Sequence, residues 1–248
     1  MPRLTSRLAA ALCAVVSATA ALTACASESH GVDVSGGWGG QVGAARAEPE
    51  ASLLVFGDSW TFGLAATTVT GGYAYRTGQI LGWATTVDGE NGSGYLRAGQ
   101  YGGYYGTRVA ELDPDLEPDV VVVQGSINDR EQPLSALPRA AKAVWSAVAA
   151  TYPDAELVIL GPAPSQLPVD ERIAQIDDVL SDLALEQGLD YISPIEDAWI
   201  TEQNYDAVID TTPTGHNHPS DDGHAYLAEK LVSELQGTET AAQVTAGR

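Results

Sequence analysis

The sequence predicts a three-layer α/β/α sandwich built on a mainly parallel sheet. Short, continuous apolar runs alternate along the chain with segments whose apolar residues recur every three or four positions. Strands that are apolar along their whole length are buried on both faces, so the segments between them are expected to be helices that cover both faces of the sheet.

Four segments are expected to form the strands of this sheet. Three are strongly apolar and end near Gly or Pro, and the last is weaker; they are residues 53–56, 120–123, 157–160 and 189–192. No internal repeat and no second linker interrupts this alternation, which indicates one domain.

Three helices are expected between and after these strands. Residues 140–150 are rich in Ala, and residues 173–183 carry one apolar stripe. In the last helix, Leu227, Leu231 and Leu235 follow one another at intervals of four. We expect that helix to end before Gly237, a residue type typical of helix C-caps.

The N-terminal residues are expected to be an export signal. Residues 1–24 hold two Arg and no acidic residue, and an apolar run from Leu8 to Leu22 follows the Arg pair. Leu22-Thr23-Ala24-Cys25 resembles the lipobox of bacterial lipoproteins, in which Cys25 would carry the lipid. The alternative is an ordinary secretory signal that ends near a Cys. The predicted organisation is a signal peptide (1–24), a lipidated Cys and flexible tether (25–50), one folded domain (51–237) and a disordered tail (238–248).

Charge and composition restrict the partners. The chain has 33 acidic residues, 12 Lys and Arg, and a formal net charge of −21, which argues against binding to nucleic acid. No nucleotide-binding Gly motif and no tight Cys/His cluster occurs, so neither a cofactor nor a metal is expected. We expect a monomer that contacts a membrane only through the lipid on Cys25, exported to the outer face of the bacterial cytoplasmic membrane or secreted.

Small polar residues follow the predicted strands or precede the last helix. Gly57-Asp58-Ser59 follows the first strand, and Ser126-Ile127-Asn128-Asp129 follows the Val-rich strand. Asp221 and His224 form an Asp-x-x-His pattern at the start of the last helix. In parallel sheets ligands bind beyond the carboxyl ends of the strands. A hydroxyl, an amide and a His with its carboxylate are the groups that acyl transfer requires.

These three motifs, in this order, resemble those of the SGNH hydrolases of the GDSL type, a family of esterases and lipases with an α/β/α, flavodoxin-like fold. The resemblance extends from Leu53 to about Leu235. Two departures stand out: Trp60 occupies the position of the Leu in the motif's name, and Ser126 occupies that of a Gly in the family's Gly-x-Asn-Asp block.

The resemblance implies a role for each motif residue. Ser59 would be the nucleophile, with its own N–H in the oxyanion hole. Gly92, with Gly94 as the nearby alternative, would supply a second N–H, and Asn128 would supply its side-chain amide. His224 would take the proton from Ser59, and Asp221 would orient His224.

Each motif also has a plain structural interpretation. Asp58 and Ser59 are typical helix N-caps, and Asn128-Asp129 is typical of a turn. His216 and His218 are expected to be loop residues, although a place at the pocket rim or in weak metal binding stays open. The Tyr residues at 95, 101, 104 and 105 are interpreted as packing, with a substrate platform as the alternative.

The expected function is a serine esterase that hydrolyses carboxylic esters of small acyl groups, with O-acetyl on carbohydrate as one such class. Two alternatives remain: an acyltransferase of the same fold, and a non-catalytic glycan-binding surface lipoprotein. The expected partner is therefore a small-molecule or glycan ester, and its acyl and alcohol parts are not determined by the sequence.

Overall fold

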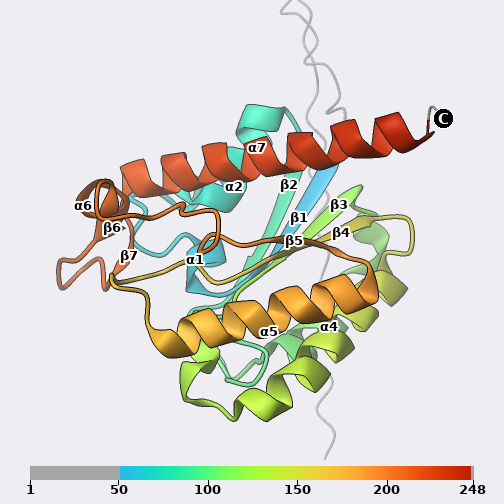
Figure 1. The fold of residues 1–248 in the computed structure, drawn as a ribbon. Coiled ribbons are helices and arrows are strands. Elements are labelled where there is room, and N and C mark those ends of the chain that lie inside the picture. Colours follow the sequence, from blue (N-terminus) through green and yellow to red (C-terminus); the bar gives the residue numbers. More distant parts are fainter. Residues whose placement is uncertain (1–50, 247–248) are drawn as a thin grey trace, which may run out of the picture. The chain divides into compact units, whose positions relative to one another are not determined.

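Five parallel strands form the central sheet of the computed structural model, which describes residues 51–246 (Figure 1). In chain order they are β1 (Ser52–Gly57), β2 (Ala84–Gly89), β3 (Val120–Gln124), β4 (Glu156–Leu160) and β5 (Asp190–Ile192). Their spatial order is β2-β1-β3-β4-β5, and every pair is parallel. The predicted fold class is therefore confirmed.

Helices cover both faces of this sheet (Figure 1). One face packs against α4 (Leu137–Thr151) and α5 (Glu171–Gln187), and the other packs against α2 (Tyr73–Leu81) and α7 (Asp221–Ala246). Three one-turn helices lie in the connections: α1 (Ser59–Phe62), α3 (Tyr105–Arg108) and α6 (Tyr205–Val208). A short antiparallel ribbon pairs β6 (Ile209–Asp210) with β7 (His218–Pro219).

Successive residues of each central strand enter opposite cores. In β1, Leu54 and Phe56 pack toward α4 and α5, whereas Leu53 and Val55 pack toward α2 and α7. All four are at most 1% exposed. Burial on both faces explains why this strand is continuously apolar rather than alternating.

Besides the one-turn helices and the β6-β7 ribbon, two elements of the main layers were not expected from the sequence. β2 is an edge strand with the sequence Ala-Thr-Thr-Val-Asp-Gly, so it lacks the long apolar run of a central strand. α2 begins after Gly72 and contains Tyr, Thr and Gly, which weakens its helical pattern. The β-branched run at Thr85–Val87 and the Gly residues that flank both elements are the signals that indicate them.

The end of the last helix also differs from the prediction. α7 continues to Ala246, so Gly237 lies inside it and the expected disordered tail at 238–248 is wrong for residues 238–246. A glycine in an exposed helix interior costs about 1 kcal/mol relative to Ala, which favours a helix end without imposing one. A Cβ at Gly237 would meet no atom within 4 Å, so no tertiary contact requires glycine there.

The strand order brings the chain segments after β1, β2 and β3 to one edge of the sheet. Gly57 is in register with Gly89, and Phe56 is in register with Val123. Because β2 and β3 flank β1, the connections on its two sides leave toward different helices, and such a switch point is where open α/β sheets bind ligands.

Candidate active site

Ser59 is the first residue of α1, and only Asp58 separates it from the end of β1. Asp58 caps this helix, because its Oδ1 accepts the N–H of Trp60 at 2.9 Å. The turn is closed by Gly63, which has a φ of 82°. The strand end and the cap together fix the serine at the carboxyl edge of the sheet.

The imidazole beside Ser59 belongs to His218. Its Nε2 lies 2.8 Å from Ser59 Oγ. Its Nδ1 lies 3.1 Å from the carbonyl oxygen of Gly215 and 3.0 Å from that of His216. Carbonyl oxygens only accept hydrogen bonds, so Nδ1 carries the proton and Nε2 accepts from the serine hydroxyl. This is the tautomer that a general base for Ser59 requires.

A strained loop presents this imidazole. His216 and Asn217 have φ values of 51° and 58°, in the left-handed region that non-glycine residues rarely adopt. The pairing of β6 with β7 holds the loop, with Asp210 opposite His218. Burial lowers the pKa of His218 below its usual 6.5, and its hydrogen bonds to the two carbonyls oppose that shift.

The structure corrects the predicted partner of Ser59. His224 lies in the first turns of α7, where its Nδ1 accepts the N–H of Tyr73 at 3.2 Å and its Nε2 is 3.1 Å from Leu64 O. Both ring nitrogens are thus engaged with backbone away from Ser59. Burial lowers the pKa of His224 to about 4.

Asp221 does not orient the imidazole beside Ser59. Its carboxylate accepts hydrogen bonds from the N–H and the hydroxyl of Thr67, which ties the loop after α1 to the start of α7. The position three residues before His218 is Gly215, so the expected Asp-x-x-His arrangement is replaced there by backbone carbonyls. The buried helix face at 224, 228, 231 and 235 is a sequence signal that identifies His224 as a core residue.

Asn128 is held against the loop that contains Gly92. Its Nδ2 donates to Ser93 O at 2.9 Å, which leaves its second hydrogen free to bind a substrate oxygen. Gly92 has a φ of 78°, whereas Gly94 uses its N–H to bind Arg97 O at 2.9 Å. The structure therefore brings Asn128 and the Gly92 loop together, and of the two glycines Gly92 stays the candidate donor.

The Asp129 carboxylate binds the backbone of the loop that contains Gly92. It accepts the hydroxyl of Ser126 at 2.7 Å and three consecutive backbone N–H groups, at 2.9 to 3.0 Å, from Tyr95, Leu96 and Arg97. Gly94 is required beside it, because a Cβ there would lie 2.4 Å from Ser126 Oγ. Asn128 and Asp129 thus join the loops after β2 and β3, a structural role for Asp129 that sequence reasoning did not assign.

Arg108, at the end of α3, connects β1 to the same loop. Its Nη1 donates to Gly57 O and to Ser93 Oγ, both at 2.8 Å, and its Nη2 pairs with Asp88 Oδ1 at 2.6 Å. Its Nε lies 3.6 Å from the buried carboxylate of Glu90. This residue was not singled out from the sequence, since nothing in its flanking residues indicates burial.

A buried polar network lies behind Ser59. Asp58 is fully buried, its Oδ2 has no hydrogen-bond partner among the described residues, and burial raises its pKa to about 7. With its amide nitrogen toward Asp58 Oδ1 (3.0 Å) and Thr61 Oγ1 (2.9 Å), Gln124 donates a hydrogen bond to each of these two atoms. Thr61 Oγ1 in turn lies 3.0 Å from Tyr73 Oη.

The four tyrosines of the loop after Gly92 divide into two pairs. Tyr95 and Tyr105 are buried and stack edge to face, as the packing interpretation predicts. Tyr101 and Tyr104 are exposed, at 83% and 44%. Within residues 51–246, no group of three or more His, Cys, Asp or Glu is placed to hold a metal ion.

Comparison with known proteins identifies the family. Residues 55–226 match the model of the GDSL-like Lipase/Acylhydrolase family. The chain belongs to this family. It is a carboxylic ester hydrolase, as the resemblance implied.

Individual known proteins also resemble this chain. A GDSL lipase of Mycobacterium tuberculosis is 30% identical over 196 residues, covering 73% of this chain and 79% of its own. The aryl esterase of M. smegmatis has a TM-score of 0.59 at 15% identity, covering 75% of this chain and 99% of its own. A family two carbohydrate esterase of Clostridium thermocellum, solved with cellohexaose, has a TM-score of 0.61 at 21% identity, covering 79% of this chain and 67% of its own. At these identities the two solved structures share the fold.

The predicted signal peptide, Cys25 and tether lie outside the described residues, so export and lipidation stay predictions. None of the helices between residues 51 and 246 combines the length and the hydrophobicity that crossing a bilayer needs.

Proposed function

We propose that this protein is a serine esterase in which Ser59 and His218 act as a catalytic pair. The observation that carries the proposal is the 2.8 Å contact between Ser59 Oγ and His218 Nε2, with the opposite ring nitrogen bound to two carbonyls. A hydroxyl bound to a correctly protonated imidazole is the arrangement of nucleophilic acyl transfer.

The mechanism begins with attack of Ser59 Oγ on the ester carbonyl carbon while His218 Nε2 accepts its proton. The carbonyls of Gly215 and His216 take the place of an orienting carboxylate, and they stabilise the imidazolium through its Nδ1–H. His218 then donates its proton to the leaving alcohol. Water hydrolyses the acyl-enzyme by the same steps in reverse.

The oxygen of the tetrahedral intermediate would bind the N–H of Ser59, the N–H of Gly92 and the free amide hydrogen of Asn128. All three come from segments that follow the neighbouring strands β2, β1 and β3. Loss of one such donor typically lowers kcat about 10²–10³-fold.

Esters of small acyl groups are the proposed substrates, with O-acetyl groups on carbohydrate as the first class to test. The acidic chain has only two Phe, a composition unlike that of an enzyme that binds lipid surfaces. The fold shared with a carbohydrate esterase supports testing acetylated glycans first.

The test is hydrolysis of p-nitrophenyl acetate by the wild type, Ser59→Ala and the control Ser181→Ala, which lies on α5. We expect Ser59→Ala to lose activity while its circular dichroism stays native, and the control to keep it. Release of acetate from acetylated xylan, compared with acylation of an added sugar, separates hydrolysis from transfer. A folded Ser59→Ala variant with the wild-type rate would refute the proposal.

A further inference from the structure

Trp60 follows Ser59 in the chain and lies beside His218 in space. It is the second residue of α1, so one helical turn carries both the Ser59 hydroxyl and the Trp60 indole. The ring centroids of Trp60 and His218 are 6.4 Å apart, and the two ring planes are inclined by 46°. The imidazole of His218 therefore contacts two consecutive side chains of the same turn, the hydroxyl through Nε2 and the indole through its ring.

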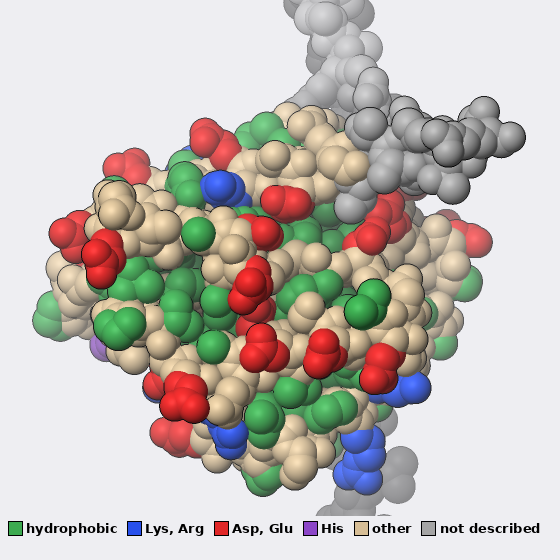
Figure 2. Space-filling model, viewed as in Figure 1, with side chains coloured by type: hydrophobic (Ala, Val, Ile, Leu, Met, Phe, Trp, Pro, Cys, Tyr) green, Lys and Arg blue, Asp and Glu red, His purple; other side chains and the backbone are tan. Residues whose placement is uncertain are grey.

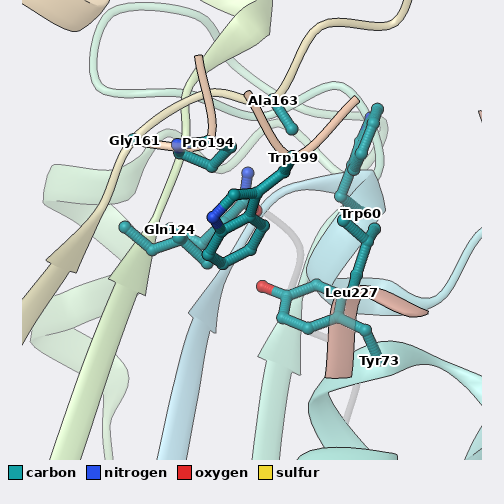
Figure 3. Close-up of a pocket in the computed structure, with 9 residues that line it drawn as sticks. Trp60, Tyr73, Gln124, Gly161, Ala163, Pro194, Trp199 and Leu227 are labelled. Atoms are coloured by element: carbon teal, nitrogen blue, oxygen red, sulfur yellow. The ribbon is translucent and has the colours of Figure 1, made fainter. Parts of the chain in front are cut away.

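The core holds the Trp60 indole in place. Trp60 is 3% exposed and belongs to the hydrophobic core between the sheet, α2 and α7. Figure 3 shows it with Tyr73 and Trp199 among the side chains that surround a small pocket in this core. The backbone of Trp60 is fixed as well, because Asp58 accepts its N–H at 2.9 Å. A side chain packed in this way has little freedom to move.

The loop that carries His218 is held less firmly by its own contacts. Most of the residues from 211 to 217 are exposed, and the ribbon that closes the loop has two residues in each strand. So short a ribbon is weak by itself. The carbonyls that bind His218 Nδ1 belong to Gly215 and His216, so they move with this loop. Only a contact with another element can fix the imidazole relative to Ser59, and α1 supplies that contact.

Two departures from the family pattern meet at this contact. Trp60 occupies the position of the Leu in the motif's name. Gly215 stands three residues before His218, where the family's Asp-x-x-His pattern has a carboxylate that orients the base. An indole is larger and more rigid than a Leu side chain. The larger side chain thus contacts a base that lacks an orienting carboxylate.

We propose that Trp60 is the positioning residue of the catalytic pair, and that its indole holds the His218 imidazole at Ser59 where an orienting carboxylate is missing. This inference rests on the proposed function, because it concerns how the base of that reaction is kept in line. Loss of the indole should lower kcat more than it changes KM, since the substrate still binds while the proton transfer is misaligned.

The first test is Trp60→Leu, which introduces the family residue and removes the ring contact. We expect kcat for p-nitrophenyl acetate to fall at least about tenfold, because a shift of about 1 Å in a catalytic group can cost about 10²-fold. Trp60→Phe keeps an aromatic ring and should recover part of the loss. If Trp60→Leu does not fold, Trp60→Phe is compared with the wild type and should show a smaller change in the same direction.

The matched control is Leu231→Ala. Leu231 is fully buried in the same core, in the middle of α7, so its truncation destabilises that core without removing the ring contact of His218. We expect the folded control to keep the wild-type kcat. A general weakening of the core would instead lower kcat in Leu231→Ala and Trp60→Leu alike.

The pH profile separates positioning from a merely structural role. Burial lowers the pKa of His218, and the indole contributes to that burial, so Trp60→Leu should move the acid limb of kcat/KM up toward 6.5. Loss of a cation–π interaction would lower the pKa instead. That interaction acts within about 6 Å of the ring centroid, whereas these rings are 6.4 Å apart, so burial decides the sign.

The titratable groups on the elements around His218 are the same in wild type and variant. They are His216 on its own loop, Asp210 opposite it on β6, Asp58 before α1, and Asp221, Asp222 and His224 at the start of α7. A displaced acid limb in Trp60→Leu therefore reports the loss of the indole.

The outcomes separate this inference from the esterase proposal. Wild-type kcat in folded Trp60→Leu overturns the inference, and so does a lower kcat with an unmoved acid limb or an equal loss in Leu231→Ala. If only Trp60→Phe folds, unchanged kcat and an unmoved limb in that variant overturn it. In each case the esterase proposal stands if Ser59→Ala is inactive, whereas hydrolysis that persists in Ser59→Ala overturns both.

Discussion

At the scale of single residues, the main feature is an imidazole oriented by backbone oxygens. A carboxylate beside a catalytic His stabilises the imidazolium and raises its pKa, whereas carbonyl dipoles do so less strongly. In this protein burial is the largest influence on His218, and the net effect lowers its pKa. The base should therefore stay neutral in mildly acidic solution.

This predicts the pH dependence of the reaction. Activity requires neutral His218, so kcat/KM should fall as the pH decreases through a pKa below 6.5. The measurement is kcat/KM for an acetyl ester from pH 4.5 to 8. An acid limb centred above pH 7 would contradict the environment described for His218.

Gly215 is the residue that makes this arrangement fit. A Cβ at this position would lie 2.4 Å from Asp210 O, so Gly215→Ala must displace the loop that carries His218. We expect kcat to fall about 10²-fold with a smaller change in KM, because a shift of about 1 Å in a catalytic group has such an effect. Steady-state kinetics of this variant test the prediction. Wild-type values of kcat and KM would contradict it.

Sequence reasoning placed Ser59 at the candidate site but paired it with His224, whereas the structure pairs it with His218. Ser59 and Asn128 lie in the short segments after β1 and β3, strands that their apolar runs indicate clearly. The histidine was chosen by the Asp-x-x-His spacing, which Asp221 and His224 satisfy and which His218 does not, since Gly215 stands three residues before it. Every residue has a backbone carbonyl, so the sequence does not show which carbonyls bind the histidine.

At the scale of elements, the site depends on α3 joining three segments. Arg108 contacts the carbonyl of Gly57 at the end of β1, the loop after β2 and the carboxylates of Asp88 and Glu90. Its guanidinium also lies 4.4 Å from the ring centroid of Phe56. This side chain therefore helps to set the spacing between Ser59 and the Gly92 loop, together with Asn128 and Asp129.

Replacement of Arg108 should reduce both stability and rate. Arg108→Met leaves Glu90 buried without its cation, and breaking such a pair typically costs about 3–5 kcal/mol of the free energy of unfolding. We also expect a lower kcat in the fraction that folds. Urea denaturation and kinetics of Arg108→Met, beside the exposed-site control Arg139→Met, test this; equal stability of the two variants would be the contrary outcome.

The predicted central strands are buried on both faces and are apolar throughout. The predicted helices are buried on one face and carry one continuous apolar stripe. The edge strand β2 and helix α2 were missed because each has one exposed side and little apolar periodicity. The connections between β2 and β3 could not be predicted, since their shape depends on contacts with Asp129 and Arg108 that are distant in sequence.

At the scale of the whole molecule, the acidic residues are spread over the surface, as one face shows over α5 and α7 (Figure 2). The domain nevertheless contains a buried neutral histidine that links two helices. His224 of α7 accepts the backbone N–H of Tyr73 at the start of α2, and protonation of that nitrogen would remove the hydrogen bond.

This linkage predicts a loss of stability in acid. The pKa of His224 is about 4 in the folded state and about 6.5 when unfolded, so the unfolded state binds more protons between these values. The corresponding stability is complete above pH 6.5 and lost as the pH falls through 4, and it amounts to about 3 kcal/mol. Asp58 acts in the opposite direction, because its folded pKa is raised.

The measurement is the free energy of unfolding of wild type and His224→Gln between pH 4 and 7. The variant should lose less stability than the wild type as the pH falls, by about 3 kcal/mol, while the exposed-histidine control His216→Gln should follow the wild type. Parallel curves for wild type and His224→Gln would contradict the assignment of His224 as a buried neutral residue.

The central claim, that His218 and not His224 is the base for Ser59, is tested most directly by kcat/KM for p-nitrophenyl acetate in His218→Ala and His224→Gln at pH 8. We expect His218→Ala to lose about 10²–10⁴-fold and His224→Gln, when folded, to stay close to the wild type. The reverse result, with His218→Ala active and a folded His224→Gln inactive, would contradict the account.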